Sequence, residues 1–138
     1  MPDLTLSDES GTTLALRSLR GTPVLVNLWA TWCAPCVVEL PMLDTVAGEM
    51  DGKLRVLTVS QDMTETQKVA PFLAERGGSR LEPWLDPKSD LTFALGAQTL
   101  PTTILYDAQG LEIWRYVGGA DWTSAQSARL IAEAFAAR

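Results

Sequence analysis

The sequence predicts one α/β domain, residues 1–138, in which helices flank a mixed central β-sheet and a β-hairpin lies at the N-terminus. The length of 138 residues suits a single domain. The short, nearly continuous apolar run Val24–Ala30 indicates a central strand that is covered on both faces. The expected order after the hairpin, β-α-β-α and then β-β-α, combines parallel and antiparallel strand pairs in one sheet.

The first part of the chain is expected to form the hairpin, the central strand and a long helix. Leucines at positions 4, 6, 14 and 16 alternate with polar residues around a polar turn, which is typical of a short hairpin. The helix after the central strand runs from about Pro35 to Met50, and Pro41 is expected to kink it. One apolar stripe of this helix consists of Cys36, Leu40, Leu43, Ala47 and Met50.

The middle of the chain is expected to continue with a strand and a helix. Leu54–Ser60 is the next strand. Thr64 is expected to cap a helical segment that runs toward Arg76, and Pro71 indicates that the main part of this helix starts near Ala70.

The remaining elements are two short ones, a hairpin and a closing helix. Trp84–Leu85 is predicted as a short edge strand, and Asp90–Leu95 as a short helix capped by Asp90 or its neighbour. Thr102–Tyr106 and Leu111–Val117 form an antiparallel hairpin. A helix over 123–137 closes the domain and is expected to bury Leu130, Ile131, Ala134 and Phe135.

The residue counts exclude many kinds of site. The chain has no histidine and two cysteines, Cys33 and Cys36, so one chain cannot form a Ser-His-Asp or Cys-His centre. A Cys₂His₂ or Cys₄ zinc site and a 2-His-1-carboxylate iron site are excluded for the same reason. We therefore expect neither a resident metal nor a cofactor. The net charge of −6, without a basic stripe, argues against nucleic acid as a partner.

The two cysteines lie where the central strand meets the long helix. Residues three apart on a helix are close enough for a disulfide. Cys33 at the helix N-terminus faces unpaired N–H groups that stabilise a thiolate, so it is the expected nucleophile. Cys36, one turn further and on the apolar stripe, would resolve the mixed disulfide. Pro35 fits, because the first turn of a helix does not use its missing N–H.

Other readings of a Cys-x-x-Cys pair are buried structural thiols, a permanent disulfide or half of a metal site. A redox-active pair is favoured by the preceding apolar strand, by Trp32 before the first cysteine and by Pro35 between the two. A c-type haem site is excluded because Val37 stands where it needs a histidine.

The sequence resembles the thioredoxin superfamily, and within it the TlpA/ResA-like thiol-disulfide oxidoreductases of bacterial envelopes. The matching stretches are residues 23–36, which end in Trp-Cys-Ala-Pro-Cys, then Glu39 with Pro41, and residues 99–103, Thr-Leu-Pro-Thr-Thr. Further segments between Leu85 and Thr123 look most like TlpA. The resemblance implies a thioredoxin-like fold and a reductase of protein disulfides.

The resemblance also implies the residues that contact a client protein. Pro101 is expected to follow a cis peptide bond and to face the Cys33 sulfur, whereas the alternative is an ordinary trans proline that starts a strand. Leu100 would then offer backbone groups to an extended client segment. The expected contact surface consists of Trp32, Ala34, Pro35, Thr99, Leu100 and Pro101.

Glu39 is the expected side-chain proton carrier near the sulfurs. A partly buried carboxyl there has a raised pKa and could exchange a proton with Cys36, whereas the alternative is a solvated acid favoured by the helix dipole. Asn27 stands where thioredoxins hold a buried acid, and an amide cannot take up a proton at neutral pH. Trp29 is expected in the core, and Trp84, Trp114 and Trp122 are expected to be packing residues.

By resemblance, the clients are oxidised proteins of cytochrome c maturation or of copper delivery to cytochrome oxidase, and the electron donor is a membrane thiol reductant. The N-terminal residues lack a secretory pattern, whereas the group is periplasmic or membrane-anchored facing the periplasm, which is the location we expect. We expect a monomer. The rival functions are a copper-binding chaperone, a thiol peroxidase, and an adaptor in which the cysteines form a structural disulfide.

Overall fold

The structure is a computed structural model that describes residues 1–136. The expected end of the last helix, Ala137, lies outside the described residues. Within them, the strands are β1 (Thr5–Ser7), β2 (Thr13–Ala15), β3 (Val24–Trp29), β4 (Arg55–Ser60), β5 (Trp84–Leu85), β6 (Thr102–Tyr106) and β7 (Glu112–Val117). The α-helices of residues 1–136 are α1 (Ala34–Glu49), α2 (Val69–Arg76), α3 (Asp90–Leu95) and α4 (Ala125–Ala132).

The strands form one mixed sheet, as predicted, in the order β2-β1-β5-β4-β3-β6-β7. β3 is central, with β4 parallel on one side and β6 antiparallel on the other. The prediction of an edge position for β5 is wrong. β5 lies inside the sheet, because β4 pairs with it on one side and Ser7 of β1 pairs with Leu85 on the other.

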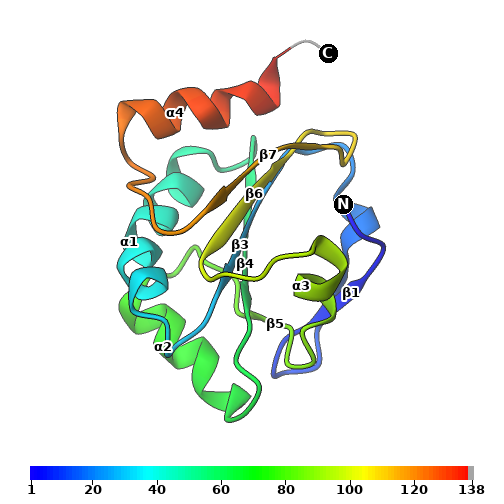
Figure 1. Cartoon of the computed structure of the whole chain (residues 1–138), viewed down its shortest axis with the longest axis vertical. Coiled ribbons are helices and arrows are strands. Elements are labelled where there is room, and N and C mark those ends of the chain that lie inside the picture. The colour runs from blue at the N-terminus through cyan, green and yellow to red at the C-terminus, as the bar shows by residue number, and fades with distance from the viewer. Residues whose placement is uncertain (137–138) are drawn as a thin grey trace.

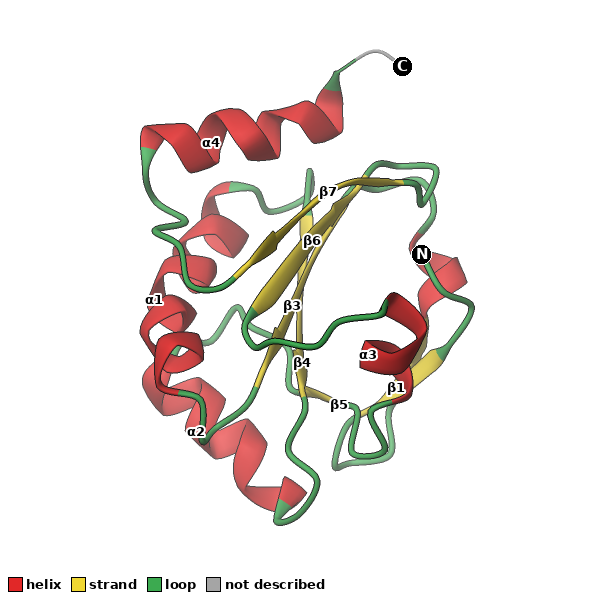
Figure 2. Cartoon of the chain, viewed as in Figure 1, coloured by secondary structure: helices red, strands yellow, loops and turns green. Residues whose placement is uncertain are grey.

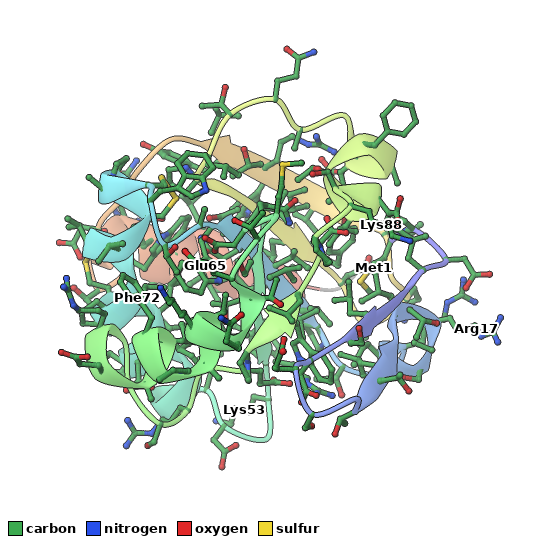
Figure 3. The ribbon with its side chains drawn as sticks, turned by 90° about the horizontal axis from the view of Figure 1, so that it is seen from below. Met1, Arg17, Lys53, Glu65, Phe72 and Lys88 are labelled. Carbon is green, nitrogen blue, oxygen red and sulfur yellow. A yellow bond between two sulfur atoms is a disulfide. The ribbon has the colours of Figure 1, made fainter. Side chains whose placement is uncertain are left out.

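Helices cover both faces of the sheet (Figures 1 and 2). On one face, α1, α2 and α4 pack against the sheet in one apolar cluster. On the other face, α3, the N-terminal hairpin and a 3₁₀ turn at Leu16–Leu19 enclose a second cluster. Side chains of β3 alternate between the two clusters, with Leu25 and Trp29 in the first and Val26 in the second. Seen from below, side chains fill both layers while Arg17 projects from the periphery (Figure 3).

The long helix follows its predicted course from just after Cys33 to Glu49. Pro35 lies in its first turn and Pro41 inside it, as expected. The apolar stripe is confirmed, although its C-terminal part is only half-buried. The fully covered residues are Cys36, Leu40 and Leu43, and Val46 is also buried, whereas Ala47 and Met50 pack against the cluster from its margin.

Two predicted helix caps are wrong. Thr64 does not cap α2, because a 3₁₀ turn at Thr66–Lys68 precedes that helix, which begins at Val69. α3 has no side-chain cap from Ser89. Instead, the buried Asp86 carboxylate accepts the backbone N–H of Leu91, with distances of 3.1 and 3.2 Å to its two oxygens. The stop at Gly96 is confirmed by its left-handed conformation.

The closing helix is shorter than predicted. α4 begins after Ser124, whose hydroxyl accepts the N–H of Ser127, and a 3₁₀ turn at Glu133–Phe135 follows it. Ile131 and Ala134 are buried as expected, but Leu130 is half-buried and Phe135 is exposed. The tighter turn changes the helical phase, so that Phe135 leaves the apolar face. No helix among residues 1–136 is long and apolar enough to span a membrane.

Candidate active site

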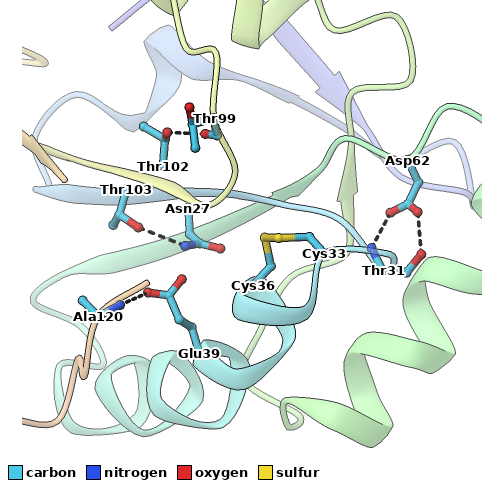
Figure 4. The surroundings of a disulfide bond; sticks show 10 residues. All are labelled: Asn27, Thr31, Cys33, Cys36, Glu39, Asp62, Thr99, Thr102, Thr103 and Ala120. Atoms are coloured by element: carbon cyan, nitrogen blue, oxygen red, sulfur yellow. Dashed lines mark hydrogen bonds between the residues drawn. A yellow bond between two sulfur atoms is a disulfide. The ribbon is translucent and has the colours of Figure 1, made fainter. Parts of the chain in front are cut away.

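Cys33 and Cys36 form a disulfide at the junction of β3 and α1, with their Cα atoms 5.3 Å apart (Figure 4). Cys33 is the N-cap residue of α1. Its N–H donates to Ala30 O at 3.2 Å, and its carbonyl oxygen accepts the N–H of Val37 at 3.1 Å. Cys33 is 7% exposed and Cys36 is fully buried. An incoming sulfur can therefore reach Cys33 first.

The N-terminus of α1 favours negative charge on Cys33 after reduction. The first helical turn contains no acidic residue, and its N–H groups point toward the cap position. The helix dipole acts in the same direction. Cys36 lies one turn deeper, among the apolar residues of the first cluster, where a charged sulfur is less favourable.

Trp32 and its neighbours surround the disulfide with exposed apolar surface. Trp32 is 70% exposed, and Ala34 and Pro35 are also exposed. The turn before Trp32 is held by Asp62, which follows β4. The Thr31 N–H and hydroxyl donate to the buried Asp62 carboxylate at 3.1 and 2.5 Å, and Ser60 Oγ donates to it at 2.5 Å.

The second predicted segment, residues 99–101, lies at the same end of the sheet (Figure 4). The peptide bond between Leu100 and Pro101 is cis, as predicted. Antiparallel pairing sets Thr102 opposite Leu28, so the segment before Thr102 meets the end of β3 that leads to Cys33. Pro101 is buried, Leu100 is half-buried and Thr99 is exposed. The Pro101 carbonyl accepts the N–H of Gly118 at 2.8 Å.

Glu39 is buried on α1, with only 1% of its surface exposed, so the alternative of a solvated acid is wrong. Its Oε2 atom accepts the backbone N–H of Ala120 at 2.9 Å and the indole N–H of Trp122 at 2.6 Å. Its Oε1 atom has no partner. Burial raises the pKa of Glu39, and the hydrogen bonds from Ala120 and Trp122, together with the nearby Asn27 amide, partly offset this rise.

Trp122 is more than the packing residue that the sequence indicated. It stacks on Trp114 with ring centroids 6.1 Å apart, and it also holds Glu39. Sequence reasoning missed this contact because 83 residues separate Trp122 from Glu39. Trp29 is fully buried, and Trp84 is buried with its N–H bonded to Glu82, so both are packing residues as expected.

Asn27 is fully buried in β3, beside the Glu39 carboxyl and the disulfide (Figure 4). Its Nδ2 donates to Thr103 Oγ1 on β6 at 3.0 Å, and its Oδ1 has no donor. Within residues 1–136, no group of three or more Cys, Asp and Glu side chains is arranged to hold a metal ion. The residues brought together are therefore two sulfurs, one buried carboxyl and one buried amide.

Comparison with known proteins places the chain. A model of the AhpC/TSA family matches residues 1–111. The chain belongs to this family. Among solved structures, a Chlorobium tepidum protein described as a thiol:disulfide interchange protein DsbE has a TM-score of 0.85 and 25% identity, covering 98% of this chain and 94% of its own. The pneumococcal exposed lipoprotein thioredoxin Etrx1 has a TM-score of 0.81 and 24% identity, covering 96% and 99%. The predicted thioredoxin-like fold is thus confirmed.

Three curated relatives of this member of the AhpC/TSA family are bacterial proteins. The thioredoxin-like protein YneN of Bacillus subtilis is 32% identical over 80% of this chain and 65% of its own length. The thiol-disulfide oxidoreductase ResA of Geobacillus thermodenitrificans is 33% identical over 79% and 62%. The thiol:disulfide interchange protein DsbE of Pseudomonas fluorescens is 36% identical over 79% and 59%. The chain spans 59–65% of the length of these three relatives. The resemblance to the ResA-like group is confirmed, and the nearer likeness to TlpA stays a prediction.

Proposed function

We propose that the protein is a thiol-disulfide oxidoreductase that reduces disulfides in client proteins. The observation that carries this proposal is the asymmetric Cys33–Cys36 pair, with Cys33 at a helix N-terminus near the surface and Cys36 buried behind it. A merely structural disulfide needs no such asymmetry. Relatives named as thiol-disulfide oxidoreductases support the same activity.

The reaction transfers two electrons from the dithiol to the client. The Cys33 thiolate attacks one sulfur of a client disulfide, which forms a mixed disulfide and releases the other client sulfur as a thiolate. Cys36 then loses its proton and attacks the Cys33 sulfur. The second client thiolate leaves, the two client thiolates take up protons, and the enzyme is left with the Cys33–Cys36 disulfide.

Glu39 accepts the proton that Cys36 releases. Its carboxyl lies on the same helix face as Cys36, three residues further along, and its Oε1 atom is unoccupied. Burial raises its pKa, which brings the carboxyl closer to the pH range where it can both take up and release a proton. Since the chain contains no histidine, a carboxyl is the side chain suited to this task.

The client binds across the exposed surface around Cys33. Trp32, Ala34 and Pro35 offer apolar contact on one side of the disulfide. On the other side, an extended client segment pairs with the backbone at Thr99 and Leu100 beside the buried Pro101. The resemblance to TlpA/ResA-like proteins supports clients in cytochrome c maturation or cytochrome oxidase copper-site assembly, a membrane thiol reductant as donor, and a location facing the periplasm.

Substrate trapping tests the function. With reduced Cys36→Ser protein, an oxidised client protein should accumulate as a mixed disulfide through Cys33, because the resolving sulfur is missing. The matched control is the double variant Cys33→Ser/Cys36→Ser, which should trap nothing. The proposal is wrong if no adduct forms with any oxidised envelope protein and the wild-type dithiol does not reduce a model protein disulfide. Fast turnover of hydrogen peroxide would instead favour a thiol peroxidase.

A further inference from the structure

Asn27 presents a buried acceptor to the face of the sheet that packs against α1. Leu25 and Trp29, two residues away on either side, share this face and belong to the same cluster as Cys36. The amide is fully buried, and Nδ2 donates to Thr103. Oδ1 has no donor. A buried oxygen in this state bears the desolvation penalty without the compensating bond.

The free oxygen points toward the sulfurs. In Figure 4 the Asn27 amide lies between the Glu39 carboxyl and the disulfide, with its oxygen on the side of the sulfur atoms and its nitrogen toward Thr103. The nitrogen also lies close enough to Glu39 to favour the ionised carboxylate. A disulfide has no hydrogen to donate, whereas a thiol has one. In the oxidised state the sulfurs therefore cannot donate to this acceptor.

We propose that Asn27 is a positioning residue for the redox couple: when the disulfide is reduced, the Cys36 thiol donates its hydrogen to Asn27 Oδ1. This inference rests on the proposed dithiol cycle. A thiol reductant supplies two electrons that break the Cys33–Cys36 bond, which leaves Cys33 as the thiolate, and one proton is added to Cys36, where it faces Oδ1. The bond keeps Cys36 protonated until Cys33 has formed the mixed disulfide, and it stabilises the reduced protein relative to the oxidised one.

Few charges compete with this effect. Besides the two cysteines, the titratable side chains that Figure 4 draws around the disulfide are Glu39 of α1 and Asp62, which follows β4. Asp62 lies on the far side of Cys33, and its carboxylate accepts hydrogen bonds from the hydroxyls of Thr31 and Ser60. The neighbouring strands contribute the hydroxyls of Thr103 and Thr58, which do not titrate in this range.

The test compares Asn27→Leu with the wild type in a glutathione redox titration. The variant lacks the acceptor Oδ1 and the donor Nδ2, and its side chain has the same branching and the same number of heavy atoms. We expect its equilibrium constant to shift about tenfold toward the disulfide, which corresponds to a potential about 30 mV more negative. The pKa of Cys36, followed by NMR of its Cβ in the reduced protein, should be lower than in the wild type, because the thiol form has lost its acceptor.

Thr58→Val is the matched control. Thr58 pairs with Asn27 across the sheet and is fully buried, and its hydroxyl donates to Glu82 O at 2.8 Å. It should keep the wild-type potential. The proposal is overturned if Asn27→Leu shifts the potential no more than Thr58→Val does, or if the pKa of Cys36 rises.

A measurement on the wild type covers the case in which Asn27→Leu does not fold. The side-chain carbonyl ¹³C resonance of Asn27 should move on reduction in the direction expected for a new hydrogen bond, and an unchanged resonance would contradict the proposal. Neither experiment involves a client. A wild-type dithiol that shows these shifts but reduces no protein disulfide would disprove the proposed function and leave the assignment of Asn27 intact.

Discussion

Replacing Trp122 by phenylalanine should make Glu39 harder to ionise. The indole N–H donates to Glu39 Oε2 at 2.6 Å and helps to offset the effect of burial on the pKa of this carboxyl. A hydrogen bond to a charged group contributes about 1.5–3 kcal/mol, and about 1.4 kcal/mol corresponds to a tenfold change in an ionisation equilibrium. The pKa of Glu39 should therefore rise further, and its ionisation equilibrium constant should fall by about tenfold or more.

The assay is a ¹³C NMR titration of the Glu39 carboxyl in the oxidised protein. Trp114→Phe is the control, because Trp114 stacks on Trp122 but donates its N–H to Leu130 O. This control removes a similar amount of aromatic surface without touching Glu39. If Glu39 accepts the proton of Cys36, the resolving step should also require a higher pH in Trp122→Phe. The reasoning is refuted if the pKa of Glu39 is no higher in Trp122→Phe than in Trp114→Phe.

Three further predictions concern stability and the active-site turn. The raised pKa of Glu39 means that the folded state favours the protonated form, so the wild type should lose stability as pH rises through that pKa. Urea unfolding at a series of pH values should show that Glu39→Gln removes this dependence of the free energy of unfolding on pH. An unchanged pH dependence would contradict the raised pKa of Glu39. Asp62→Asn should lower the free energy of unfolding by about 1–3 kcal/mol and reduce hydrogen-exchange protection of the Thr31 amide, which would stay protected if Asp62 did not hold the turn. Leu43→Ala, at a fully buried position of α1, should cost about 2–5 kcal/mol by urea unfolding, and a loss below 1 kcal/mol would show that the helix is loosely packed.

Much of the fold follows from local patterns. The apolar run of β3, the stripe of α1 and the turn between β6 and β7 can each be predicted from a segment of about fifteen residues, and the predicted bounds agree with the structure to within a few residues. The position of β5 inside the sheet cannot be predicted in this way. This two-residue strand pairs with β1 and β4, which come from distant parts of the chain. The predicted burial of Phe135 is wrong for a different reason, because the composition of the segment does not indicate the change from α-helix to 3₁₀ turn.

The site shows the same division. The spacing of Cys33 and Cys36 and the proline at 101 could be recognised from the sequence. The partners of Glu39 could not, because Ala120 and Trp122 reach it from a loop more than 80 residues away. Asp62 has a weak sequence signal: it follows β4, the parallel neighbour of β3, so both strands end near the same edge of the sheet.

A glutathione redox titration of the Cys33–Cys36 couple tests the central claim most directly. A catalytic couple on this fold should equilibrate with glutathione as a two-electron system, with a potential between about −270 and −120 mV. A potential below about −300 mV would identify a structural disulfide and would contradict the account of a thiol-disulfide oxidoreductase.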